Sequence, residues 1–169
     1  MFDEKMHPIT DPPTILALTG VALLVMIAAL LRKKVVFTDA KTRTEDIPAI
    51  FQRLQRTAKD GSFVTFMFTP PGERSSQEAV NLQFSIEQSR VGLDWVLLAP
   101  SNVRDKERFA QFASARGYRV FEREMNKVKY LRVEDGGSLP DLCKAVIHDL
   151  YFISPESQLD LLTDGFAWP

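Results

Sequence analysis

The chain has 169 residues, of which 45% are hydrophobic and 25% charged, with a formal net charge of -1 and a mean hydropathy of -0.10. The near-neutral charge argues against a general nucleic-acid binder, which needs clustered Lys and Arg to neutralise phosphates. A single cysteine, Cys143, excludes a disulfide-bonded secreted scaffold. Without the first 34 residues, which hold four basic and three acidic side chains, 135 residues remain with a net charge of -2, enough chain for one domain.

Residues 14–31 form an apolar segment without a single charge. Eighteen residues are at the lower end of what crosses a hydrocarbon core of about 30 Å as a helix. The segment lacks the polar stripe expected of a core helix in a soluble domain. A cleaved signal peptide fits poorly, because the chain starts with MFDEKMH and the segment runs directly into three basic residues. The sequence therefore predicts a transmembrane helix over residues 14–31.

The charges on either side of this segment predict its orientation. Arg32, Lys33 and Lys34 follow it, whereas the preceding tail holds one Lys and three acids, so the C-terminal side is expected in the cytoplasm. The three basic residues either contact anionic lipid head groups, at about 1 kcal/mol each, or only stop translocation. The predicted organisation is an external tail (1–13), the transmembrane helix (14–31), a basic juxtamembrane linker (32–43) and a cytoplasmic α+β domain (44–169).

Hydrophobic periodicity predicts eight elements in this domain, in the order α-β-β-β-α-β-β-α. They form an α+β fold with a five-strand, largely antiparallel sheet packed by helices. The tail over residues 154–169 is ambiguous between helix and strand. The expected elements are a helix over 46–59, strands over 63–68, 80–87 and 91–98, a helix from 101 or 102 to 117, strands over 118–125 and 128–134, and a helix from 138 to 151.

One face of the predicted sheet is apolar although it lies away from the helices. Exposed apolar patches of this kind mark interaction surfaces. Alternatively, the tail or the basic linker covers this face. Asp94, a carboxylate between Leu93 and Trp95, is either a partner-binding charge or lies at the solvated edge of the face. The candidate partner-binding residues on this face are Phe63, Met67, Asp94, Val96, Leu98, Phe121 and Leu131.

No group of residues in the sequence predicts catalysis or metal binding. Cys143 stands one turn into a predicted helix, where a thiol can become nucleophilic, but it belongs to the apolar stripe of that helix. Two histidines, His7 and His148, are too few for a zinc site or a Ser-His triad. We therefore expect no catalytic residue, no metal, no cofactor and no nucleic-acid partner.

Three stretches of the domain resemble a known group of proteins. NLQFSIEQSRVGLDWVLLAP (81–100), YLRVEDGG (130–137) and LCKAVIHDLY (142–151) are similar to bacterial chaperone-like domains of the TY-Chap and sensory-transduction-regulator kind. The order of the predicted elements likewise resembles the type III secretion chaperone fold. The resemblance covers residues 44–153 and implies a domain that binds other proteins, as a chaperone or in a toxin and immunity system, and often as a dimer.

These observations combine into one functional expectation. We expect a non-enzymatic protein-binding module anchored in the bacterial inner membrane, most specifically an immunity protein that binds and neutralises a toxin. The alternative is a regulatory or assembly subunit of a membrane protein complex. The expected partner is accordingly a toxin or a membrane-complex subunit, and a homodimer also agrees with the resemblance.

Overall fold

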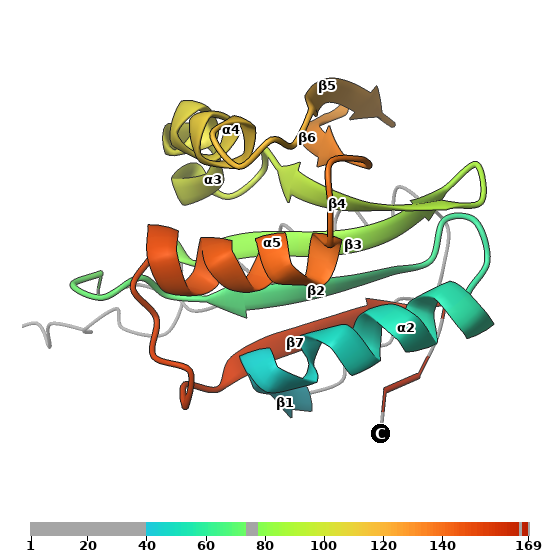
Figure 1. Cartoon of the computed structure of the whole chain (residues 1–169), viewed down its shortest axis with the longest axis horizontal. Coiled ribbons are helices and arrows are strands. Elements are labelled where there is room, and N and C mark those ends of the chain that lie inside the picture. The colour runs from blue at the N-terminus through green and yellow to red at the C-terminus, as the bar shows by residue number, and fades with distance from the viewer. Residues whose placement is uncertain (1–39, 74–77, 166, 169) are drawn as a thin grey trace, which may run out of the picture.

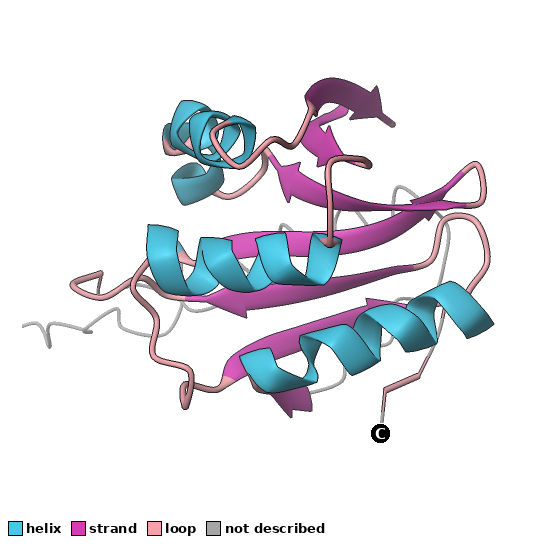
Figure 2. Ribbon diagram, viewed as in Figure 1, coloured by secondary structure: helices cyan, strands magenta, loops and turns pink. Residues whose placement is uncertain are grey.

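A computed structural model of the chain describes residues 40–73, 78–165 and 167–168. Seven strands form one sheet in the order β1-β7-β2-β3-β4-β6-β5, and all neighbouring strands are antiparallel. The helices α2 and α5 pack on one face of this sheet (Figure 1). Helix α4 joins them, because its Phe109 stacks on Trp95, a residue of that face, with ring centroids 4.7 Å apart. None of the described helices covers the opposite face (Figure 2).

The bounds of the elements are as follows. The strands are β1 (Ala40–Thr42), β2 (Phe63–Phe68), β3 (Val80–Glu87), β4 (Arg90–Val96), β5 (Val120–Met125), β6 (Val128–Val133) and β7 (Leu159–Asp164). The helices are the 3-10 turn η2 (Thr44–Asp46), α2 (Ile47–Thr57), α3 (Pro100–Arg104), α4 (Lys106–Ser114) and α5 (Leu139–Ala145), which the π-helical turn η4 (Val146–Leu150) continues.

The hydrophobic core lies between the sheet and its helices. Ile47, Ile50 and Leu54 recur at helical spacing along α2, so one stripe of that helix is fully buried. Phe66 of β2 and Phe84 of β3 meet edge to face beneath it, with ring centroids 5.8 Å apart. In β3 the apolar side chains of Val80, Leu82, Phe84 and Ile86 alternate with residues on the other face, so this strand is recognisable in the sequence.

Several predicted elements are confirmed. The strands over 63–68 and 80–87 have the expected bounds. Ser138 caps α5 as predicted, since its hydroxyl accepts a hydrogen bond from the backbone N–H of Asp141 at 3.3 Å. The helix expected to run to residue 117 is instead two short helices, because Asp105 leaves the helical conformation with φ -95° and ψ 12°.

The prediction of a five-strand sheet is wrong, because the sheet has seven strands. Strand β1 falls within the predicted linker, and its three residues are too short to show a period. Strand β7 is the ambiguous tail, and it lies between β1 and β2. Its Leu161 faces the helices but its Leu162, which is equally buried, faces the other side, so simple alternation does not reveal this strand.

The prediction of a single-pass inner-membrane protein is also corrected. Across the described residues, no helix combines the length and the apolar character needed to cross a bilayer. The segment for which the span was predicted, residues 14–31, lies outside the described residues, as do Arg32, Lys33 and Lys34.

The packing of α5 leads to a stability prediction. Leu142 is 1% exposed in the core, so Leu142→Ala is expected to lower the free energy of unfolding by about 2–5 kcal/mol through lost burial and a residual cavity. Val103 is 56% exposed, and Val103→Ala is expected to change the free energy of unfolding by less than about 0.5 kcal/mol. Urea unfolding of both variants measures the difference. Equal effects of the two changes would contradict the placement of α5.

Candidate functional site

The candidate site is the sheet face that carries no described helix, called here the helix-free face. The strand register brings six of its side chains into one line across the sheet, from β7 to β5. We call this line the central row. Its members, in spatial order, are Leu162, Thr65, Gln83, Asp94, Arg132 and Phe121.

Four members of the central row are buried. Leu162 and Thr65 are each 2% exposed, Asp94 is 1% exposed and Arg132 is 0% exposed. An antiparallel sheet with one solvated face normally turns polar, accessible side chains to that side. The helix-free face therefore has a buried layer of its own, made of apolar Leu162, the hydroxyl-bearing Thr65 and the ion pair of Asp94 with Arg132.

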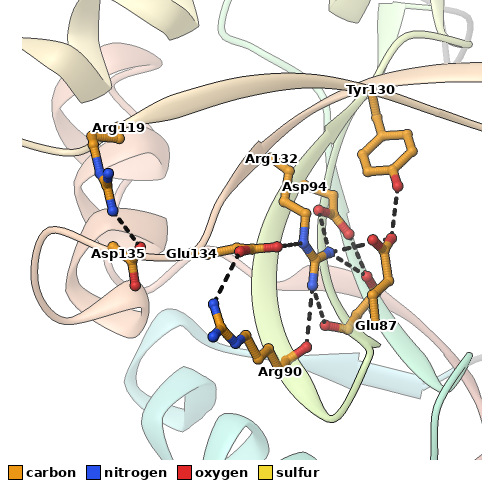
Figure 3. Close-up of polar contacts among 9 residues, drawn as sticks. Glu87, Arg90, Asp94, Arg119, Tyr130, Arg132, Glu134 and Asp135 are labelled. Carbon is orange, nitrogen blue, oxygen red and sulfur yellow. Dashed lines mark hydrogen bonds and ion pairs between the residues drawn. The ribbon is translucent and has the colours of Figure 1, made fainter.

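Arg132 is the centre of the ionic half (Figure 3). Its Nη1 donates to Oδ1 of Asp94 at 2.8 Å, and its Nε donates to Oε1 of Glu134 at 2.7 Å. The same Nη1 lies 3.4 Å from Oε1 of Glu87. Glu87 in turn accepts a hydrogen bond of 2.8 Å from the hydroxyl of Tyr130. Three carboxylates therefore surround one guanidinium, and the cluster carries an excess of negative charge.

Gly92 gives the guanidinium its place on the sheet. A Cβ at this position of β4 would lie 2.3 Å from Cζ of Arg132, far inside van der Waals contact. The guanidinium can therefore lie flat over the backbone, where it donates to Oγ of Ser85 at 2.9 Å and to the carbonyl of Arg90 at 3.1 Å. Only glycine at residue 92 is compatible with this position of Arg132.

Burial dominates the electrostatics of the cluster. It raises the pKa of Asp94 to about 6, although the Arg132 charge and the hydrogen bond from Ser85 act to lower it. Burial also raises the pKa of the Tyr130 hydroxyl well above its usual range, and the hydrogen bond to Glu87 adds to that effect. For Arg132 burial acts to lower the pKa, but the surrounding carboxylates outweigh it and the pKa is raised. Arg132 therefore carries its positive charge at neutral pH.

The predicted partner-binding residues fall into two groups. Four of them, Phe63, Met67, Val96 and Phe121, lie on the helix-free face and are half-buried, and Asp94 lies in the central row between them. Asp94 is buried and paired, which corrects its expected place at a solvated edge.

The other two predicted residues lie elsewhere. Leu131 pairs with Trp95 in the register of β6 against β4, so it faces the helices and belongs to the core. Leu98 lies in the turn after β4, where it is half-buried. The prediction that Leu131 belongs to the helix-free face is wrong, because Phe121 pairs with Arg132 and the two predicted residues therefore point to opposite sides.

Of this cluster only Asp94 was predicted from the sequence, whereas Arg132 and its partners Ser85, Glu87 and Glu134 were not. One signal was present: Arg132 stands between Leu131 and Val133, as Asp94 stands between Leu93 and Trp95. Opposite charges, each flanked by large apolar residues in a strand, favour a buried ion pair when the two strands are neighbours. β4 and β6 are neighbours only because of the strand order in the sheet, and that order was not predicted from the sequence.

The side chains considered for catalysis, Cys143 and His148, both contribute to the packing of the fold. Cys143 is fully buried, and this burial raises the pKa of its thiol far above the ordinary value. His148 lies with Nδ1 2.7 Å from the carbonyl oxygen of Ile153 and Nε2 3.0 Å from Oγ1 of Thr44, so it links η4 to η2. His7 is outside the described residues. Within residues 40–73, 78–165 and 167–168, no three His, Cys, Asp or Glu side chains are grouped to hold a metal ion.

Comparison of the chain with protein-family models, with curated proteins and with solved structures gave no match. The similarity of residues 81–100, 130–137 and 142–151 to chaperone-like domains therefore stays a prediction. The helix-free face has to be interpreted from its own geometry.

The position of Gly92 under Arg132 predicts a coupling between the two residues. Gly92→Ala is expected to displace the guanidinium and to lower the free energy of unfolding by about 3 kcal/mol, because Asp94 loses its buried partner. In an Arg132→Ala background the same change is expected to cost at least 1 kcal/mol less, since the clash is gone. A double-mutant cycle by urea unfolding measures the coupling. Additive effects would contradict the contact.

The raised pKa of Asp94 predicts a pH dependence. The folded carboxyl titrates at about 6 and the unfolded one near its ordinary value of about 3.9, so between these pH values the folded state binds a proton that the unfolded state releases. Relative to Asp94→Asn, the wild-type free energy of unfolding is therefore expected to fall, by roughly 2 kcal/mol, as the pH rises from 4 to 7. Urea unfolding of both proteins across this range measures it. A constant difference between them would contradict the burial of Asp94.

Proposed function

We propose that this protein is a protein-binding module that acts through its helix-free face and catalyses no reaction. The observation that carries this proposal is the central row. Four of its six side chains are buried on a sheet side that no described helix covers, and half-buried Phe63, Met67, Val96 and Phe121 lie beside it. Half-buried apolar side chains on a sheet face without a described helix over it are suited to docking another protein.

The two halves of the face differ in chemistry. On β2 the accessible groups are apolar, with Phe63 and Met67 on either side of Thr65, whereas β7 sets Asp160 and Asp164 opposite them. At the end of β3 and just after β6 the face presents two carboxylates, since the Glu87 side chain is 22% exposed and that of Glu134 is 16% exposed. Arg132 holds both carboxylates in place from beneath. A complementary partner presents apolar side chains to the first half and a basic side chain to the second.

The narrower form of the proposal is an immunity protein that neutralises a bacterial toxin. Two features support it: the similarity of residues 44–153 to chaperone-like domains, and the burial of Cys143, the one nucleophilic thiol. Neutralisation needs a tight complex and no chemistry, which agrees with a docking face whose Glu87 and Glu134 carboxylates already contact Arg132.

Co-expression tests the narrower form. The full-length protein is produced together with the product of the neighbouring gene, and growth and complex formation are measured. Rescue of growth together with a stable complex on size-exclusion chromatography is expected. Absence of both the complex and the rescue removes the immunity proposal, and a homodimer as the sole complex removes the toxin as the partner.

Charge substitutions test whether the helix-free face makes the contact. Phe63→Asp and Met67→Asp are each expected to weaken the complex about ten- to hundredfold, because a buried apolar side chain of this size contributes about 1.5–3 kcal/mol. Val103→Asp is the matched control, since Val103 is an exposed apolar residue of α3. Calorimetric titration with the partner gives the three affinities. A larger effect of Val103→Asp than of Met67→Asp would place the contact elsewhere.

A further inference from the structure

Strand β5 is an open edge of the sheet. It is the last strand in the sheet order, and among the described residues it pairs with β6 alone (Figure 1). Its residues from Glu122 to Met125 are all exposed. An edge strand presents a row of unpaired backbone N–H and C=O groups, which can pair with an extended segment of another chain. The strand is therefore a surface at which the sheet can grow by one strand.

The hairpin between β5 and β6 determines which backbone groups are free. Its two turn residues, Asn126 and Lys127, have positive φ values of 51° and 68°, as in a type I′ turn. In such a hairpin the residues on either side of the turn, here Met125 and Val128, form a hydrogen-bonded pair. These pairs alternate along an antiparallel ladder, so every second residue of β5 directs its N–H and C=O away from β6.

Glu124 is one of the residues whose backbone groups point outward. It lies opposite Lys129, whose carbonyl accepts a hydrogen bond of 2.9 Å from the N–H of Leu97, just after β4. The backbone groups of a non-hydrogen-bonded pair point away from each other, so those of Glu124 point to the free edge. Alternation adds Glu122 and Val120 to this set. The N–H and C=O groups of these three residues are therefore available to an added strand.

One side of β5 is acidic. Glu122 lies opposite Leu131, a residue of the core, so it projects to the side of the helices. There it pairs with Lys106 of α4 at 2.9 Å, and its side chain is still 51% exposed. Glu124 projects to the same side, because side chains two residues apart in a strand share a face. A segment added next to β5 therefore meets two carboxylates on this side.

The other side of β5 is basic. Arg123 lies on the helix-free side with Phe121, and the Cζ atoms of Arg119 and Arg123 are each 5.6 Å from the centroid of the Phe121 ring. Among the described residues Arg119 pairs with Asp135 at 2.7 Å, whereas Arg123 has no ion-pair partner. A segment added next to β5 therefore meets a positive charge on this side.

A second copy of the chain does not fit this edge. A two-fold axis perpendicular to the sheet pairs two β5 strands antiparallel and brings the same side of each together. The two registers that pair most of the strand set Glu122 opposite either Glu122 or Glu124 of the second copy. The latter register also sets Arg123 opposite Arg123. Like charges directly opposite destabilise a strand pair, so the edge favours a different chain.

We propose that β5 takes up an extended segment of a partner protein as a further strand of the sheet, with a basic side chain of that segment opposite Glu124 and an acidic one opposite Arg123. Backbone hydrogen bonds to Glu122 and Glu124 supply affinity, and the two charge pairs supply specificity. This inference goes beyond the proposed function, because it assigns a second contact surface, separate from Phe63 and Met67, and names the chemistry of the segment that fits it.

Two synthetic peptides of identical composition test the charge pairing. Both carry only Thr, Val and Tyr besides one Lys and one Glu. In antiparallel pairing one peptide sets Lys opposite Glu124 and Glu opposite Arg123, and the other exchanges the two charges. Titration of the full-length protein, followed by NMR, is expected to show about tenfold tighter binding of the first peptide. The combined change Arg123→Glu and Glu124→Lys keeps the composition of the protein and is expected to reverse this preference.

Amide hydrogen exchange separates strand addition from simple charge attraction. Binding of the first peptide is expected to slow the exchange of the Glu122 and Glu124 amides about tenfold or more. The Arg123 amide, already bonded to β6, is the internal control and is expected to change little. Methylation of the peptide nitrogen opposite Glu122 removes a backbone donor and is expected to weaken binding about tenfold. Circular dichroism and urea unfolding establish that the charge-exchanged protein is folded.

The other outcomes overturn the inference. They are no binding of either peptide, equal binding of both, and unchanged exchange of the Glu122 and Glu124 amides. Slow exchange of these amides in the free protein also overturns it: a second copy occupies the edge if the protection depends on protein concentration, and the same chain occupies it if not. If the peptides fail but Phe63→Asp still weakens the complex with the partner, the proposed function stands. If the peptides bind but Phe63→Asp has no effect, the edge stands and the helix-free face is not the contact.

Discussion

A single guanidinium joins three adjacent strands of the sheet, β6, β4 and β3. Arg132 extends from β6 across Gly92 of β4, where its Nη1 reaches the hydroxyl of Ser85 on β3 at 2.9 Å. Asp94 supplies the opposite charge from β4. Because an arginine removed from water costs several kcal/mol unless it is paired, β4 and β6 are stable only in the register that sets Asp94 opposite Arg132. A slip of one residue would turn Arg132 into the apolar core.

The sheet therefore has a different kind of packing on each side. Towards the helices it is held by apolar and aromatic contacts, such as the stack of Trp95 on Phe109. On the helix-free side it is held by an ionic cluster with strict geometry. Every buried side-chain nitrogen and oxygen of the described residues has a hydrogen-bond partner, so this cluster is fully satisfied. The cluster therefore holds the Glu87 and Glu134 carboxylates in defined positions on this side of the sheet.

Local sequence patterns were sufficient for the long elements and insufficient for their arrangement. Strands β2 and β3 and the cap of α5 are predictable, because alternation and capping depend on residues close together in the chain. The pairing of Asp94 with Arg132 is not, since α3, α4 and β5 separate the two strands in the sequence. The face of Leu131 was misassigned for the same reason: only its pairing with Trp95 sets which side of β6 faces the helices.

The position of β7 between β1 and β2 has a consequence for how the protein is made. Lys41 of β1 and Asp160 of β7 form an ion pair across 119 residues of chain. At 5–20 residues per second, a ribosome needs roughly 6–24 s to cover that separation. During this time β2 has a bare edge and Leu162 does not yet exist. The edge of β2 that β7 later covers is thus unpaired throughout this interval, when a nascent-chain chaperone has its greatest effect.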